Sequence, residues 1–80
     1  MPWFYFDVME VDGGITEDTV GMEIASEEEA KRQADRALAD MTSEEIHKGK
    51  DFRIRVRARD ESGTVISSRQ TDVSQRDWER

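Results

Sequence analysis

Hydrophobic and polar residues alternate without a break from Phe52 to Arg59. The apolar phase is Phe52, Ile54, Val56 and Ala58, and the other phase, here called the arginine ladder, is Arg53, Arg55, Arg57 and Arg59. A period of two residues is typical of a β-strand with one buried face and one solvated face. In a helix these arginines would point in all directions around the axis, so the pattern predicts a strand.

A second alternating segment covers residues 3–9 and carries aromatic side chains in both phases. The two phases are Phe4, Phe6 and Val8, and Trp3, Tyr5, Asp7 and Met9. Such a strand is expected in the middle of a sheet, or with a partner on its second face. After the turn residues Asp12-Gly13-Gly14, we expect a loop over Ile15–Val20 and a short strand over Gly21–Ile24.

The capping-box signature Ser26-Glu27-Glu28-Glu29 predicts the start of a helix, with the Ser26 hydroxyl accepting the Glu29 N–H and the Glu29 carboxylate returning to the Ser26 N–H. Apolar residues follow at helical spacing, at Ala30, Ala34, Ala37, Leu38 and Met41. We predict one helix that continues to about His47 and stops at Lys48-Gly49. Thr42 is an alternative second cap, with which the helix would break near Met41.

The turn sequence Asp60-Glu61-Ser62-Gly63 predicts a hairpin into a fourth strand, Thr64–Val73. With Gly63 in the left-handed conformation, Asp60 is expected to pair with Thr64, and Ala58 to face Ile66. This register would place Ser68 and Gln70 on the inner face, where they would pack poorly. The fourth strand is therefore expected at an edge of the sheet.

Together these elements predict an α+β fold of order β-β-α-β-β. Chain direction favours a four-stranded antiparallel sheet of order 2-1-3-4, with one helix packed on one face and the other face open. Residues 1–73 are expected to form a single α+β domain, and residues 74–80 a polar C-terminal tail that contains Trp78. Eighty residues are near the lower limit for a domain that is stabilised by its core alone.

The net charge of -7 is unevenly distributed: residues 1–45 contain 13 acidic and 3 basic residues (-10), and residues 46–80 contain 6 and 9 (+3). Net acidity argues against a general nucleic-acid binder, because affinity for phosphates depends on the cations presented. The absence of cysteine excludes disulfides and thiolate sites. No signal peptide or membrane-spanning run is recognised, so a cytoplasmic location is expected.

The arginine ladder is the most suggestive chemical feature. Arginines two residues apart on a strand lie about 6.6 Å apart, close to the step between phosphates of a single nucleic-acid strand. The candidate interaction face consists of Trp3, Tyr5, Arg53, Arg55 and Arg57. The sequence nevertheless favours the interpretation that acidic residues, including Asp7 and Glu10, pair with the arginines across strands, and that the charges keep an exposed strand soluble.

Other candidate groups predict no chemistry. His47 falls where a helix should end, which suits a surface cation at the negative end of the helix dipole. Asp12, Glu17 and Asp18 lack the spacing of a calcium loop. No general base that could activate a serine nucleophile is recognised in the sequence, and Gly13-Gly14 lacks the lysine of a phosphate-binding loop. We therefore expect no catalytic residues, cofactor or metal, and no enzyme.

A set of residues, taken in their order along the chain, also resembles the sequence pattern of a known family. The matching positions are Met1-Pro2, Phe4-Tyr5-Phe6-Asp7, Asp12-Gly13, Asp18, Gly21-Met22-Glu23-Ile24, Glu29-Ala30, Ala34, Ala37-Leu38, Gly49, Val56-Arg57 and Asp60-Glu61-Ser62-Gly63. From Met1 to roughly Val73 the chain resembles DUF6894, a domain-of-unknown-function family abundant in rhizobia and related alphaproteobacteria. The resemblance implies no activity.

Two functions of different class follow from the sequence. The first is a small cytosolic module that acts by protein–protein contact, or by self-association as a homo-oligomer, through the open sheet face. It rests on Trp3, Tyr5 and Met9, which lie in the phase that the helix does not need. The second is single-stranded nucleic-acid binding on that same face.

Overall fold

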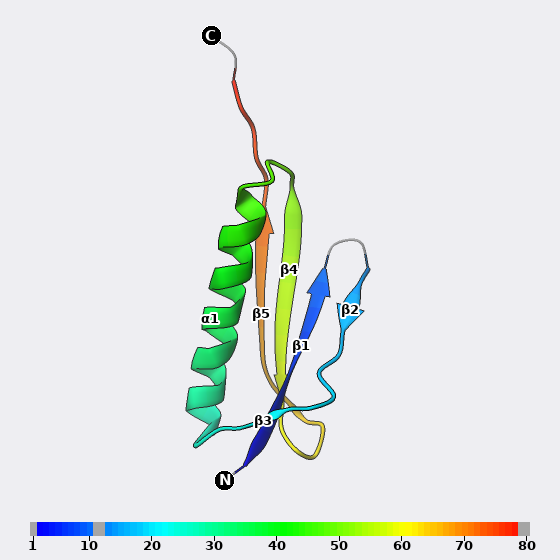
Figure 1. Cartoon of the computed structure of the whole chain (residues 1–80), viewed down its shortest axis with the longest axis vertical. Coiled ribbons are helices and arrows are strands. Elements are labelled where there is room, and N and C mark those ends of the chain that lie inside the picture. Colours follow the sequence, from blue (N-terminus) through cyan, green and yellow to red (C-terminus); the bar gives the residue numbers. More distant parts are fainter. Residues whose placement is uncertain (1, 11–12, 79–80) are drawn as a thin grey trace.

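The computed structural model describes residues 2–10 and 13–78. Its elements are β1 (Trp3–Glu10), β2 (Ile15–Thr16), β3 (Met22–Glu23), α1 (Glu27–Ile46), β4 (Phe52–Arg59) and β5 (Val65–Val73). Within the described residues, five strands form one antiparallel sheet, and α1 lies along one of its faces (Figure 1). The predicted α+β class is confirmed.

The sheet has the order β2-β1-β4-β5, so the two most apolar strands are central as predicted. Both short strands pair with β1: β3 places Met22 opposite Phe4, and β2 places Thr16 opposite Val8. The prediction of a loop over Ile15–Val20 was therefore wrong at its first two residues. Ile15 and Thr16 lack a long alternating pattern, and they join the sheet because the hairpin brings them beside β1, where Glu10 N–H donates to Gly14 O at 2.8 Å.

The hairpin between β4 and β5 confirms the predicted turn and corrects the predicted register. Gly63 has φ +88°, and Asp60 N–H donates to Thr64 O at 2.9 Å. However, a bulge between Ala58 and Arg59 places Ala58 opposite Ser67 and not opposite Ile66. A shift of one residue moves every side chain of a strand to the other face.

The corrected register changes which side chains of β5 lie inside the molecule. The helix-facing residues are Ser67, Arg69, Thr71 and Val73, whereas Ser68 and Gln70, which we expected inside, are exposed on the opposite face. Thr71 Oγ1 lies 3.3 Å from Thr42 Oγ1 of α1, and Arg69 pairs with Asp35 of α1. As predicted for the fourth strand, β5 is an edge strand.

α1 is a single helix that ends as the sequence predicts. Lys48 N–H donates to Glu45 O at 3.0 Å, and Gly49 turns the chain away with φ +71°. Ser26 Oγ accepts the Glu29 N–H at 3.1 Å, which confirms the N-cap. The reciprocal half of the capping box was wrong, because the Glu29 carboxylate accepts instead from Arg32 and Gln33.

Replacing Ser26 by alanine is expected to lower the free energy of unfolding by about 1 kcal/mol, because the Glu29 N–H loses its acceptor. Thermal denaturation followed by circular dichroism measures the effect. Thr42→Ala is the control: it removes one hydrogen bond to β5 and no helix cap, so a smaller loss is expected. An equal loss in both variants would contradict the assignment of Ser26 as the cap.

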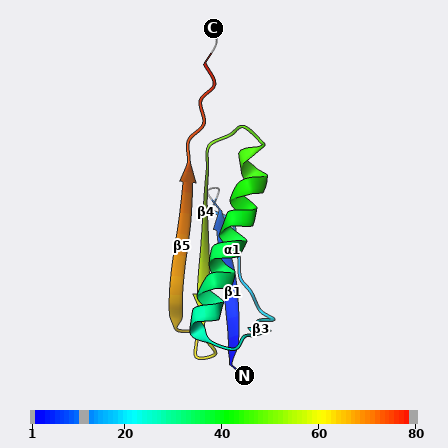
Figure 2. The same cartoon turned by 90° about the vertical axis from the view of Figure 1, so that its left-hand side faces the viewer.

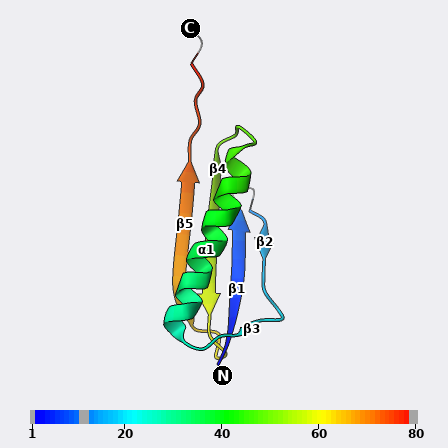
Figure 3. The same cartoon turned by 60° about the vertical axis from the view of Figure 1, so that its left-hand side comes forward.

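The core lies between α1 and the centre of the sheet (Figures 2 and 3). Its buried apolar side chains are Phe4, Ile24, Ala30, Ala34, Ile54, Val56 and Ala58. Ala30 and Ala34 have no exposed surface, so α1 approaches the sheet closely, as its small side chains predict. Two polar side chains are also buried, Asp7 and Ser67, and Asp7 lies at the centre of the site described next.

Candidate functional site

The sheet face that points away from α1 is called here the open face. It carries the second phase of β1, the arginine ladder of β4, and the even-numbered residues of β5 from Ser68 onward, beyond the bulge. These residues are Trp3, Tyr5, Asp7 and Met9, then Arg53, Arg55, Arg57 and Arg59, then Ser68, Gln70 and Asp72. All five residues of the candidate interaction face therefore lie on one surface, as the alternation predicts.

Asp7 is the centre of an ion network on the open face. Strand register places Asp7 opposite Arg57, and both arginines at this end of the ladder donate to it. Arg57 Nη2 lies 2.8 Å and Arg59 Nε lies 2.7 Å from Asp7 Oδ2, and Arg59 Nη2 lies 3.0 Å from Asp7 Oδ1. The Asp7 carboxylate has no exposed surface, so its charge is balanced by two guanidinium groups within the protein. This arrangement agrees with the cross-strand pairing of Asp7 that the sequence favours.

The ion network lowers the pKa of Asp7 to about 2, first through the hydrogen bond from Arg59, and further through Asp18 N–H and Arg57, against the opposing effect of burial. A lowered pKa means that the ionised form contributes stability above the ordinary value of 3.8, and that this contribution is lost as the pH falls through 2. We expect the Asp7 carboxyl carbon to titrate by NMR with a midpoint near 2. A midpoint near 4, as in an unstructured peptide, would contradict the network.

Asp18 fastens the segment between β2 and β3 onto this network. Its carboxylate accepts three backbone N–H groups, from Phe6 at 3.1 Å and from Val20 and Gly21 at 3.0 Å. Its own N–H donates to Asp7 Oδ1 at 3.0 Å, and its carbonyl accepts from Arg59. Burial opposes ionisation of Asp18, yet the three N–H donors lower its pKa. From the sequence, Asp18 was a position that matches the family and a weak candidate for a cation loop, and its role in this network was not predicted; the Asp-x-x-Gly spacing to Gly21 was the available signal for an aspartate-capped turn.

Gly21 lies against the ring of Tyr5 with φ +72°. A Cβ atom at this position would come within 2.7 Å of Tyr5 Cε1 and 3.1 Å of the Phe4 carbonyl oxygen. Gly21→Ala is therefore expected to lower the free energy of unfolding by about 2 kcal/mol, from backbone strain and displacement of the ring. Denaturant unfolding measures the loss. Gly13→Ala is the control, because it has a similar φ of +86° but open space around its Cβ, so an equal loss would show that only backbone strain matters.

The other half of the ladder is more exposed and less tightly paired. Arg53 forms an ion pair with Asp72, and both side chains are more than half exposed. Arg55 donates through Nε and Nη2 to Gln70 Oε1, at 3.1 and 2.7 Å. Within the described part of the chain, Arg55 is thus the member of the ladder whose hydrogen-bonded partner is neutral.

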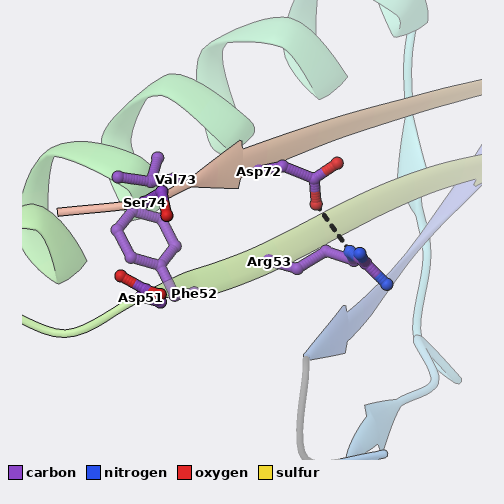
Figure 4. A pocket seen from close by; sticks show the side chains of 6 residues that line it. All are labelled: Asp51, Phe52, Arg53, Asp72, Val73 and Ser74. Carbon is purple, nitrogen blue, oxygen red and sulfur yellow. Dashed lines mark hydrogen bonds and ion pairs between the residues drawn. The ribbon is translucent and has the colours of Figure 1, made fainter.

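In the described part of the chain, shallow hollows adjoin the open face at both of its ends. The first, of about 450 Å³, is lined by Trp3, Tyr5, Val20 and Glu61, and the Arg59 guanidinium lies 5.1 Å from the centre of the Tyr5 ring. The second, of about 300 Å³, lies at the far end of β4 and β5 (Figure 4). In Figure 4 the Phe52 ring lies beside Val73, while Arg53 reaches across to Asp72.

Metal-binding groups do not gather in residues 2–10 and 13–78: no three His, Asp or Glu side chains there could hold an ion. Of the aspartates considered for a cation loop, Asp12 lies outside the described residues, and Asp18 is engaged as described above. His47 is exposed at the end of α1. In the described residues, no helix is both long and apolar enough to cross a membrane.

Comparison with known proteins identifies a family but no characterised relative. No curated protein matches the sequence, and no solved structure matches the fold. Residues 3–69 match a family described as "Domain of unknown function (DUF6894)". This match covers β1 to β4, the ion network and the first part of β5, so the chain belongs to the DUF6894 family.

Proposed function

We propose that this protein is a small non-enzymatic binding module whose open face contacts a protein partner, and that the partner presents carboxylates together with an apolar side chain. The lack of cysteine supports a cytoplasmic location, and the resemblance noted from the sequence supports an alphaproteobacterial source. One observation carries the proposal: the open face bears an uncovered tryptophan at one end and, near the other, an arginine whose hydrogen-bonded partner among the described residues is the neutral Gln70.

The apolar end of the open face supports contact with a protein. Trp3 is 42% exposed and Val20 is 79% exposed, and both line the same shallow hollow with Tyr5. Large apolar side chains that gather on an uncovered face are typical of interaction sites, and tryptophan is among the residues that contribute most to binding. Glu61 forms the polar rim of the hollow, where its carboxylate accepts the Trp3 backbone N–H.

The charged end supports a partner that carries carboxylates. Arg57 and Arg59 share the Asp7 carboxylate, and Arg53 pairs with Asp72, whereas Arg55 has the amide oxygen of Gln70. A carboxylate placed over Arg55 would gain a bidentate, charge-assisted contact. Arg55 lies opposite Met9, which is six residues from Trp3, so Trp3 and Arg55 are about 20 Å apart along the strand. A standard protein interface of about 800 Å² per side is large enough to include both.

Face-to-face packing of two copies is less favourable than a different partner. Both copies would bring an arginine ladder to the interface, and like charges that meet in a desolvated contact oppose association. An acidic surface has the complementary charge.

Single-stranded nucleic acid is the alternative occupant of the open face. The pairing of Arg57 and Arg59 with the buried Asp7 weighs against it, because guanidinium groups held by a carboxylate are less available for phosphates. Titration with oligothymidylate at low salt distinguishes the two partners. Quenching of Trp3 fluorescence, measured in a Trp78→Phe protein, that weakens steeply with salt and is lost in Arg55→Gln would favour nucleic acid and overturn the protein-contact proposal.

Site-specific photo-crosslinking, carried out in the bacterium that naturally produces this protein, tests the protein contact. The photoreactive residue p-benzoylphenylalanine replaces Trp3 in one variant and the exposed Ala39 of α1 in the matched control. Residue 3 is expected to give a discrete adduct heavier than a dimer of this chain, and Arg55→Glu in the same protein is expected to abolish it. No adduct specific to residue 3 would overturn the proposal, as would an adduct unaffected by Arg55→Glu.

A further inference from the structure

β5 is an uncovered edge of the sheet. It is nine residues long, and β4 is its only strand partner among the described residues. The helix covers a face of the sheet and leaves the outer side of β5 without a neighbouring element (Figures 2 and 3), where the Ser68 carbonyl accepts a long hydrogen bond of 3.4 Å from Arg69 Nη1. At the opposite edge, by contrast, β2, β3 and the Asp18 carboxylate pair with β1. A long edge strand that nothing covers is a template for pairing with another strand.

Hydrogen bonding in the sheet identifies the β5 groups that point outward. Phe6 N–H donates to Asp18, on the side of β1 away from β4. The backbone N–H and C=O groups of the even-numbered residues of β1 therefore point away from β4, and those of the odd-numbered residues point toward it. In an antiparallel pair of strands, hydrogen-bonded and non-hydrogen-bonded residue pairs alternate. The odd-numbered residues of β4 lie opposite the odd-numbered residues of β1, so their backbone groups point toward β1, and those of the even-numbered residues of β4 point toward β5. The odd-numbered residues of β5 lie opposite even-numbered residues of β4, so their N–H and C=O groups point toward β4; these residues are Ser67, Arg69, Thr71 and Val73. Those of Ser68, Gln70 and Asp72 are directed outward.

The regular part of β5 is centred on Gln70. The bulge between Ala58 and Arg59 interrupts the ladder next to Ile66, so the uninterrupted segment is Ser67–Val73, seven residues with Gln70 in the middle. We propose that this segment pairs antiparallel with the same segment of a second copy, about a two-fold axis at Gln70, to form one continuous sheet across a homodimer. Such an interface is closed and uses the same surface of both copies.

The side chains fit this register better than its neighbour. About Gln70, Ser68 lies opposite the partner's Asp72, and Arg69 opposite the partner's Thr71, so no like charges meet. A two-fold axis at Arg69 would place that arginine directly opposite its own copy. The axis at Gln70 also uses the outward N–H and C=O groups of Ser68, Gln70 and Asp72 in both copies, and it keeps both helices on one face of the joined sheet.

The C-terminal residues agree with a partner at this edge. Beyond Val73 the chain continues in the direction of β5 and leaves the sheet (Figure 1). Gln75 is held by Lys50 and Asp51, yet Trp78 is 84% exposed. In the antiparallel dimer each such segment runs beside the beginning of the partner's β5, which gives the extended chain and its tryptophan a surface to contact.

Sedimentation equilibrium tests the dimer at chain concentrations from about 5 µM to about 1 mM, because a weak dimer forms by mass action. The expected mass rises from the 9.3 kDa chain toward twice that value. Ser68→Asp is expected to weaken dimerisation about tenfold, since it opposes the partner's Asp72 at two symmetric positions. Within one copy the new carboxylate lies opposite Arg57, so the fold is preserved. The double variant Ser68→Asp with Asp72→Ser is expected to restore the dimer.

Ser43→Asp adds the same charge on the exposed side of α1 and is the matched control. Hydrogen exchange at both ends of the concentration range provides a second measurement. The amides of Ser68, Gln70 and Asp72 should become protected only at high concentration, whereas those of Arg69 and Thr71 are protected at both. A monomer at about 1 mM would overturn the proposal, as would a dimer that Ser68→Asp and Ser43→Asp affect equally or in which the three outward amides stay unprotected.

Discussion

Asp7→Ala is expected to lower the free energy of unfolding by about 3 kcal/mol, which is most of the stability of a domain of this size. The substitution removes the carboxylate that Arg57 and Arg59 share, so that Arg59 keeps only the more distant Glu17 Oε1 at 3.9 Å among the described carboxylates, and it removes the acceptor of Asp18 N–H. We place the loss at the lower end of the range for buried pairs because both guanidinium groups keep some contact with solvent, at 34% and 18% exposure. Urea unfolding at pH 7 followed by circular dichroism measures it.

Asp72→Ala is the matched control for Asp7→Ala. Asp72 is also a carboxylate on the open face and also pairs with an arginine of the ladder, but both partners are more than half exposed. Little or no change in stability is expected, because solvent screens an exposed pair. If Asp7 acts through Arg59, combining Asp7→Ala with Arg59→Ala should cost less than the sum of the single losses. Equal losses from Asp7→Ala and Asp72→Ala would contradict the central role of Asp7.

Ala34→Asp is expected to prevent folding altogether. Ala34 has no exposed surface and lies on the side of α1 that packs against the sheet. A carboxylate there would be buried without a partner, at a cost that exceeds the roughly 3–5 kcal/mol available to a domain this small. The far-UV circular dichroism spectrum of the purified variant is expected to be that of an unfolded chain.

Ala39→Asp is the control for Ala34→Asp. It makes the same change five residues further along α1, where the side chain is exposed. Only the lower helix propensity of aspartate then acts, a loss of about 0.5 kcal/mol. A folded Ala34→Asp protein with stability similar to that of Ala39→Asp would show that α1 does not pack on the sheet through this face.

Local periodicity in the sequence was sufficient for most of the fold. The alternation from Phe52 to Arg59 and the three-and-four spacing from Ala30 to Met41 each follow from the geometry of a single strand or helix. The N-cap at Ser26 and the left-handed glycines at positions 49 and 63 are likewise local, because they depend on residues within one turn of the chain. These features placed α1, β4 and the turn into β5, and the alternation also assigned the candidate interaction face to one surface.

Contacts between segments that are distant in the sequence determined the register of β5 and the presence of β2, which the hydrophobic pattern did not predict. The fourth strand alternates weakly, so the position of one bulge determined its register, and with it the exposure of Ser68 and Gln70. β2 is two residues long and exists only because β1 lies beside it.

The chemistry of the open face also required the tertiary structure. The sequence placed Asp7 and the arginines in solvated phases, and it could not predict that Asp18 would cover them, since that contact joins residues 11 and 41 positions apart along the chain. Alternation determined which face each side chain takes, because a strand's side-chain period is a property of its own backbone. Which charges became buried and paired was decided only by folding, because burial depends on segments that the sequence keeps apart.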